Sequence, residues 1–184
     1  MQRWNGWGDE AVSVPLPPQA LDILLDSLGK GRSREDHPLQ KLLARIPRSR
    51  SPDHPLISTD PKLRLDHAHG QSLPDWIGLR CGTLKRFPDG VALPTTMDEV
   101  RELLKLAQKS DMVVIPYGGG TSVVGHLEVP DTDRPVLSLS LERYNRIINI
   151  EPESCLEAFE GGIRGPGIEQ ELRARGFTLG HYPQ

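Results

Sequence analysis

The sequence contains few cysteines, and this scarcity excludes several kinds of small protein. Cys81 and Cys155 are the only two among 184 residues, and they stand far apart along the chain. Two separated thiols cannot supply a disulfide framework or a cysteine-rich zinc site, and they fit a reducing compartment. We interpret both as structural thiols.

Long apolar runs and an excess of positive charge are absent too. No segment approaches the roughly 20 apolar residues that span a bilayer, and residues 1–10 resemble neither a secretory signal nor a transit peptide. We therefore predict a cytoplasmic protein. The net charge of −3 argues against nucleic-acid binding, which needs clustered cations to displace counterions from phosphates. The basic residues between positions 30 and 50 are expected to form a solvated surface.

Residues 1–70 are expected to form a mostly helical, otherwise irregular segment. One helix is predicted from leucines that recur at helical spacing, with Gly29 well placed as its C-cap. These leucines are Leu21, Leu24, Leu25 and Leu28. A second short helix is expected at residues 39–46, where a proline follows and ends it. Residues 47–61 are interpreted as an extended polar linker.

A β-α-β pattern follows and is the clearest part of the sequence. Residues 91–94 are apolar and predict a short buried strand, and residues 112–115 predict a second one. Between them, Thr96 and Glu99 form a capping box at the start of a helix. The apolar face of that helix recurs at i, i+3, i+4 and i+7, at Val100, Leu103, Leu104 and Ala107. Two strands joined through one helix should be parallel and connected right-handedly.

Further strands and a final helix are expected after this unit. Apolar runs that begin at Val136, Ile147 and Cys155 are bounded by turn residues and predict further sheet strands. Ile168 and Leu172 are spaced to anchor a short helix.

The predicted elements amount to an α+β fold. We divide the chain into an N-terminal segment of residues 1–70 and a domain of residues 71–184. The length suits one ordinary domain, or a small domain with part of another.

A glycine-rich loop, P-Y-G-G-G-T-S-V-V-G, follows the second predicted strand of the β-α-β unit. Three consecutive glycines let the backbone approach a ligand closely, and their N–H groups can bind anionic oxygens. Open α/β sheets bind phosphate-bearing cofactors at such a place. The spacing matches neither a P-loop nor the G-x-G-x-x-G dinucleotide fingerprint. A turn that merely reverses the chain is the alternative.

The loop and the preceding β-α-β unit resemble the vanillyl-alcohol oxidase and p-cresol methylhydroxylase superfamily of FAD enzymes. Further stretches are similar to the alkyldihydroxyacetonephosphate synthase branch of that superfamily. These stretches are R-W-N-G-W-G at residues 3–8, A-H-G at 68–70, I-P-Y-G-G-G-T-S-V at 115–123 and G-H-Y-P at 180–183. The resemblance covers the whole chain.

The resemblance implies that residues 71–184 are the first part of an FAD-binding domain that holds FAD without a covalent bond. The resemblance also implies FAD contacts in the glycine loop and at the start of a second segment that touches FAD. At that second position the family often has an acidic residue. The implied contacts are Pro116, Tyr117, Gly118, Gly119, Gly120, Thr121, Ser122 and Gln184. Family members continue into a cap domain that carries the catalytic residues, so these are expected beyond the end of this chain and remain unknown.

Several other residues belong to types that often serve in binding or catalysis, and we interpret them as structural. His67 and His69 form an H-x-H pair without an evident third ligand, so no metal site is predicted, and local packing or hydrogen bonding is expected. His126 is interpreted as a rim histidine, not as a covalent flavin tether. Trp4 and Trp7 are expected to pin the N-terminal arm onto the domain surface. No acid–base role is assigned to the carboxylates at strand edges and helix surfaces, such as Glu157, Glu160 and Glu169.

The implied function is the FAD-binding part of a flavoenzyme that exchanges acyl for alkyl on dihydroxyacetone phosphate in ether-lipid synthesis. The chain alone is expected to be inactive. One alternative is an FAD-dependent oxidoreductase of a 2-hydroxy acid, and another is a non-catalytic nucleotide-binding module. The expected partners are FAD and a small-molecule or lipid substrate, nucleic acid is not expected, and a homodimer stays open.

Overall fold

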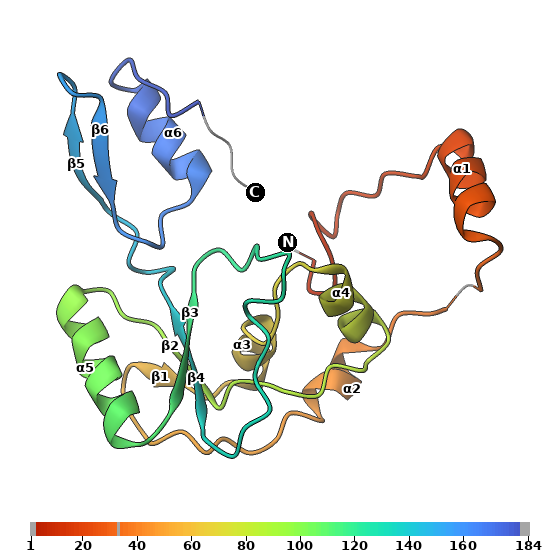
Figure 1. Cartoon of the computed structure of the whole chain (residues 1–184), viewed down its shortest axis with the longest axis horizontal. Helices are drawn as coiled ribbons and strands as arrows, with labels where there is room; N and C mark the ends of the chain where they lie inside the picture. The colour runs from red at the N-terminus through yellow and green to blue at the C-terminus, as the bar shows by residue number, and fades with distance from the viewer. Residues whose placement is uncertain (1–2, 33, 181–184) are drawn as a thin grey trace.

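A four-stranded sheet lies at the centre of the computed structural model, which describes residues 3–32 and 34–180 (Figure 1). The strands lie in the order β1 (Ile57–Ser58), β2 (Gly90–Ala92), β4 (Val136–Ser140) and β3 (Val113–Tyr117). β2 and β3 both run parallel to β4, and β1 adds an antiparallel edge. The mixture of helices, parallel strands and antiparallel strands confirms the predicted α+β class.

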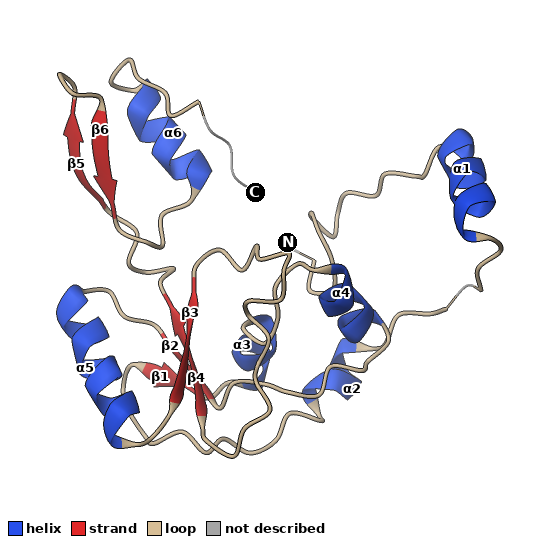
Figure 2. Cartoon of the chain, viewed as in Figure 1, coloured by secondary structure: helices blue, strands red, loops and turns tan. Residues whose placement is uncertain are grey.

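The predicted β-α-β unit consists of β2, α5 (Met97–Lys109) and β3. Its two strands are parallel as expected, but β4 lies between them and pairs with both. The expected capping box is confirmed, because Thr96 accepts from the Glu99 N–H and the Glu99 carboxylate accepts from the Thr96 N–H. α5 covers one face of the sheet through Leu103 and Ala107, which are buried (Figure 2).

The two faces of the sheet belong to two apolar clusters. Leu137 and Leu139 pack with α5 on one face, whereas Val136 packs on the other. This second cluster includes Leu42 and Leu65, which come from the N-terminal segment of residues 1–70. The boundary expected at residue 70 stays a prediction, while the packing places residues from both sides of it in one core.

The N-terminal part contains more structure than the sequence suggested. α1 (Pro18–Leu28) forms with Gly29 at its C-cap, as predicted, but has no buried residue and lies apart from the sheet (Figure 1). α2 (Leu39–Leu43) ends earlier than expected. β1 lies within the segment interpreted as an extended linker, so that interpretation was incomplete. Two further helices, α3 (Pro61–Asp66) and α4 (Leu73–Arg80), were not predicted.

The basic stretch is only partly the solvated surface that was expected. The Arg50 guanidinium forms an ion pair of 2.8 Å with the carboxylate of Asp89, whose side chain is 4% exposed. Arg50 also donates to the backbone carbonyls of Asp133 and Arg134. Arg45 donates to the carbonyl of Gly82. Two of the cations therefore connect distant segments of the chain.

A separate hairpin and helix form the C-terminal part. β5 (Ile147–Glu151) and β6 (Leu156–Phe159) confirm the two strands predicted here, and within the described residues they pair with each other in a second sheet. α6 (Gly165–Arg173) forms around Ile168 and Leu172 as expected, and both are buried. These strands form their own sheet because the loop after β4 carries the chain away from the main sheet (Figure 2).

Two carboxylates expected near the surface are buried instead. Glu160 is 4% exposed and accepts from the backbone and the guanidinium of Arg146. Glu169 is 6% exposed and accepts from Thr178 and from the backbone N–H groups of the turn after α6. Both carboxylates therefore stabilise local structure through hydrogen bonds to neighbouring segments.

Two further sequence expectations concern cross-links and membranes. Cys81 and Cys155 are both free thiols in the structure. Among the residues that the structure describes, no helix combines the length and apolar character needed to cross a membrane.

Candidate cofactor-binding site

The glycine-rich loop leaves the carboxyl end of β3, as the sequence predicts. Pro116 and Tyr117 are the last residues of the strand, and the loop continues through Gly118, Gly119 and Gly120. Gly118, Gly119 and Thr121 are exposed, whereas Gly120 is buried. The loop therefore presents backbone, not side chains, at this edge of the sheet.

Tyr117 fixes the conformation of the loop. Its hydroxyl donates to the Asp66 carbonyl at 2.9 Å, and it fills the space that a side chain at Gly120 would need. Gly120 also has a φ of +71°, in the left-handed region that favours glycine. Burial, with the nearby Asp66 carboxylate, raises the pKa of Tyr117 to about 12, so the hydroxyl stays a donor near neutral pH.

The A-H-G segment packs against the far end of the loop. The Gln71 N–H donates to the Ser122 carbonyl at 2.7 Å, and a side chain at Gly70 would collide with that same carbonyl. The His67 ring lies on the Tyr117 ring, with centroids 4.1 Å apart. Two segments about fifty residues apart in sequence thus hold one another in place.

Backbone donors of the loop are unused. The N–H groups of Gly118, Gly119, Gly120 and Thr121 donate to none of the residues that the structure describes. Four consecutive free backbone donors, placed after a parallel strand, are groups that can bind the oxygens of phosphates. The anion-binding role of the loop stays a prediction, and these unused donors are the observation that motivates it.

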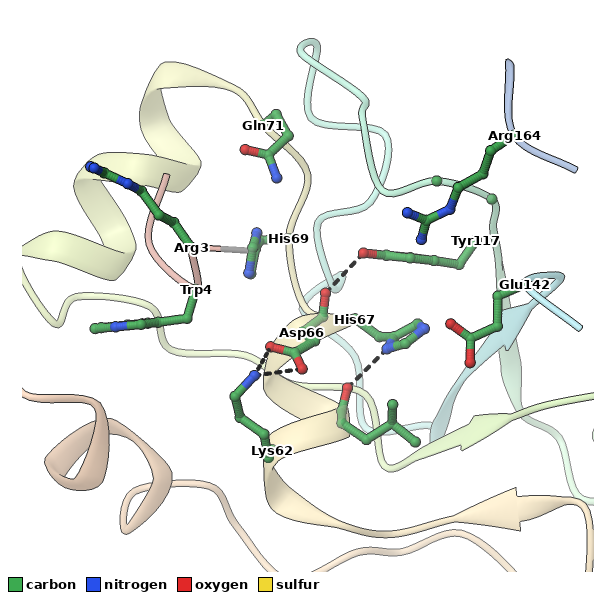
Figure 3. Close-up of a pocket in the computed structure, with 13 residues that line it drawn as sticks. Arg3, Trp4, Lys62, Asp66, His67, His69, Gln71, Tyr117, Glu142 and Arg164 are labelled. Carbon is green, nitrogen blue, oxygen red and sulfur yellow. Dashed lines mark hydrogen bonds and ion pairs between the residues drawn. The ribbon is translucent and has the colours of Figure 1, made fainter. Parts of the chain in front are cut away.

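A cavity of about 220 Å³ adjoins Gly118 and Gly119 (Figure 3). In that view, Arg3 and Trp4 lie on one side, Tyr117 and Arg164 on the other, and His69 between them. Lys62 is paired with Asp66 at 2.5 Å. The segments that line this cavity are the N-terminal arm, α3, β3, the loop after β4 and the segment before α6.

Two buried histidines face this cavity with one nitrogen unused. His67 and His69 are 4% and 6% exposed, and their Nδ1 atoms bond to the carbonyls of Leu63 and Gly70. Neither Nε2 atom has a partner among the described residues. Burial lowers the pKa of His67, so its ring is neutral near pH 7 and its Nε2 is an acceptor.

The structure also places the other residues that the sequence analysis discussed. Trp7 packs edge-to-face on Trp76 of α4, and Trp4 packs on the core, which confirms that both pin the N-terminal arm. His67 and His69 lie at the end of α3 and not on a strand, with the expected local hydrogen bonds. His126 is exposed near the loop. Gln184 lies outside the described residues.

The sequence did not single out Arg164 or Glu142 as residues of this site. Arg164 precedes α6 and Glu142 follows β4, and both line the cavity beside the loop. No local motif marks either residue, since the turn after β4 and the hairpin that follows bring them to the loop. Only the three-dimensional path of the chain could have identified them.

Comparison with known proteins gives a consistent result. Residues 88–184, just over half of the chain, match a family model described as an FAD-binding domain. The chain is 33% identical to the alkyldihydroxyacetonephosphate synthase of Trypanosoma brucei brucei over 98% of its length. A solved alkyldihydroxyacetonephosphate synthase structure superposes with a TM-score of 0.81 at 28% identity, covering 99% of this chain and 39% of that one.

Over a shorter stretch, the sequence is also similar to a different enzyme. The mitochondrial D-lactate dehydrogenase [cytochrome] of Kluyveromyces lactis is 31% identical over 52% of this chain and 17% of its own length. The chain spans about a third of the synthase from Trypanosoma brucei brucei, 35% of its length.

Proposed function

The chain belongs to the FAD-binding domain family, its cofactor is FAD, and we propose that residues 118–121 bind the FAD pyrophosphate through their backbone. The observation that carries the proposal is the row of four N–H groups without a partner among the described residues. A pyrophosphate offers acceptor oxygens to such donors. When bound, FAD supplies an electron-accepting ring, and the residues described here supply its anchorage.

The glycines at positions 118 and 119 support this role. A side chain at Gly119 would meet nothing closer than 3.6 Å, and one at Gly118 nothing closer than 3.9 Å. Neither residue has a positive φ. The packing of the chain therefore does not require glycine at these two positions, whereas the close approach of a ligand to the backbone does.

Replacing Gly119 by Val tests the proposal in a full-length version of the protein. The β-branched side chain obstructs the approach of the pyrophosphate, so flavin retention should fall at least tenfold while the circular dichroism spectrum stays unchanged. Gly31→Val is the matched control, because a side chain there meets nothing within 4 Å. An unchanged flavin absorbance in purified Gly119→Val would contradict the proposal.

We further propose that the complete enzyme exchanges the acyl chain of acylated dihydroxyacetone phosphate for an alkyl chain. The similarity to named synthases over 98% of the chain supports this, as do the R-W-N-G-W-G, A-H-G and G-H-Y-P stretches around the loop. The full-length protein, given acyl dihydroxyacetone phosphate and a labelled fatty alcohol, should form a labelled ether and release fatty acid without consuming oxygen.

Hydride transfer from a 2-hydroxy acid is the second candidate, supported by the similarity to a D-lactate dehydrogenase over half of the chain. Bleaching of the flavin by lactate or glycolate, with no ether formed, would establish it and reject the synthase. The pyrophosphate role of the loop would survive, because both chemistries need the same cofactor. A lipid substrate, a homodimer and a cytoplasmic location stay predictions.

A further inference from the structure

We infer that Trp76 and Gln71 are positioning residues, which hold the glycine loop in the conformation that binds an anion. They act through the backbone of Ser122 at the end of the loop, and neither side chain has to touch the ligand. The inference rests on the proposed pyrophosphate role of the loop and concerns the residues that order it. It also gives a function to α4, a helix that the sequence analysis did not predict.

The glycine loop depends on its two ends for order. Glycine has more conformational freedom than other residues, so a loop with three consecutive glycines loses more entropy when a ligand fixes it. At one end of the loop, the Tyr117 hydroxyl donates to the Asp66 carbonyl at 2.9 Å. At the other end, the Gln71 N–H donates to the Ser122 carbonyl at 2.7 Å. Both anchors of the loop therefore come from residues 66–71.

Gln71 is itself held by the first turns of α4. Its side-chain oxygen accepts from the indole N–H of Trp76 at 2.8 Å, across five positions of the sequence. The next residue, Ser72, is buried and forms the capping box of α4 with Asp75. Within that box the Ser72 hydroxyl donates to the Asp75 carboxylate at 2.6 Å. Gln71 is therefore fixed both by its own side chain and by the helix cap that follows it.

The N-terminal arm holds α4 in place. The Trp7 ring packs edge-to-face on Trp76, with ring centroids 6.4 Å apart and planes at 85°. At the other end of α4, the Arg80 guanidinium donates to the Asn5 carbonyl at 3.1 Å. A backbone bond of 2.8 Å also joins the His37 N–H to the Arg80 carbonyl. The helix that carries the Trp76 indole is thus fixed by contacts with two other segments.

This arrangement separates cofactor affinity from stability. Trp76 and Gln71 are only partly buried, so losing their hydrogen bond leaves groups that water can reach and changes the stability of the fold little. A loosened Gln71 leaves the loop less ordered in the free protein, and the ligand must then order it on binding. The expected effect is a weaker complex of an otherwise intact protein.

The test is a double-mutant cycle in a full-length version of the protein, with FAD affinity measured by flavin fluorescence as FAD is added to the apoprotein. Trp76→Phe keeps an aromatic ring against Trp7 but removes the indole N–H. Gln71→Met keeps the length of the side chain but removes the acceptor. Each change should weaken FAD binding about three- to tenfold, the loss of one hydrogen bond. The double variant should bind as weakly as either single variant, because both changes remove the same bond.

Trp7→Phe is the matched control. Trp7 belongs to the same pair of rings, but its indole N–H donates to none of the residues that the structure describes, so FAD affinity should change by less than about twofold. Hydrogen exchange gives a second measurement without ligand. The amide of Gln71, followed by mass spectrometry of the apoprotein, should exchange faster in Trp76→Phe and Gln71→Met than in wild type, while amides of α5 exchange unchanged.

The outcomes separate this inference from the pyrophosphate role. If Gly119→Val loses flavin while Trp76→Phe and Gln71→Met bind FAD as wild type does, the positioning role is rejected and the pyrophosphate role stands. If the two single effects add in the double variant, the shared bond is rejected. If Gly119→Val retains its flavin, the pyrophosphate role fails, and unchanged exchange at Gln71 would reject the positioning as well. Gln71→Met tests the same bond if Trp76→Phe does not fold.

Discussion

A single carboxylate, that of Asp89, connects three segments that lie far apart in sequence. It accepts from the Arg50 backbone at 3.0 Å, from the Arg50 guanidinium at 2.8 Å, and from the Val136 N–H at 2.8 Å. Burial opposes ionisation of this carboxyl, but the hydrogen bonds from Arg50 and Val136 outweigh it and lower its pKa. Asp89 therefore holds the segment before β1 and the start of β4 against β2.

Asp89→Asn should lower the free energy of unfolding by about 1–3 kcal/mol at pH 7, because the buried carboxylate that accepts from the half-exposed Arg50 and from Val136 becomes a neutral amide. The Asp89 contribution is complete above the unfolded carboxyl pKa of about 3.9 and is lost as the pH falls through its lower folded value. Urea denaturation of wild type and variant should therefore converge in strong acid. Asp131→Asn, at an exposed pair with Arg86, is the control and should change stability by less than about 1 kcal/mol.

Adjacent glycines of the loop should respond in opposite ways. Gly120→Ala places a side chain at positive φ and against the Tyr117 hydroxyl, so we expect a loss of about 1–3 kcal/mol in stability. Gly119→Ala should change stability by less than about 0.5 kcal/mol, since its new methyl group has room. Thermal unfolding of the two variants measures the difference, and equal losses would show that both glycines serve the fold.

Residue types alone identified only part of the site. Three consecutive glycines after an apolar strand predict an anion-binding loop because both signals are local. The positions of His67, His69 and Arg164 beside the loop depend on contacts between segments roughly fifty residues apart, which no spacing in the sequence encodes. Burial of Glu160 was also missed, because its partner Arg146 precedes β5 and only the pairing of β5 with β6 brings the two residues together.

At the scale of elements, α1 and α5 show how little an amphipathic pattern says about packing. Both carry apolar residues at helical spacing, yet α5 buries Leu103 against the sheet and α1 buries no residue. The short helices α3 and α4 were missed because fewer than three turns carry little periodicity, although Ser72 and Asp75 form a capping box that was readable in the sequence. β1 was missed because two residues gain strand character only by pairing with β2.

The two helices should therefore differ in their sensitivity to polar or smaller side chains. Replacing Leu24 and Leu25 of α1 by Ser should change the free energy of unfolding by less than about 1 kcal/mol, because both are over 40% exposed. Leu103→Ala in α5 should cost about 2–5 kcal/mol, because Leu103 is 1% exposed. Urea denaturation measures both. A large loss on changing α1 would mean that this helix packs in solution.

At the scale of the whole molecule, we expect the 184-residue chain to bind FAD at least tenfold more weakly than a protein of its relatives' length. Cofactor sites bury most of their ligand, and this chain spans 35% of the relative from Trypanosoma brucei brucei. The cavity beside the loop is also too small for the whole cofactor. Calorimetric titration measures the affinity, and a tight one-to-one complex would show that the chain forms a sufficient site by itself.

The strand order β1-β2-β4-β3 has a consequence for synthesis on the ribosome. β2 and β3 are made first and are joined by α5, yet each forms its parallel pairing with β4 alone. Until residues 136–140 have left the exit tunnel, the earlier strands lack that partner, and the Asp89 carboxylate lacks the Val136 N–H. A nascent chain halted before β4 should therefore be sensitive to protease and prone to aggregate, and release of these five residues should protect both sides of the sheet at once.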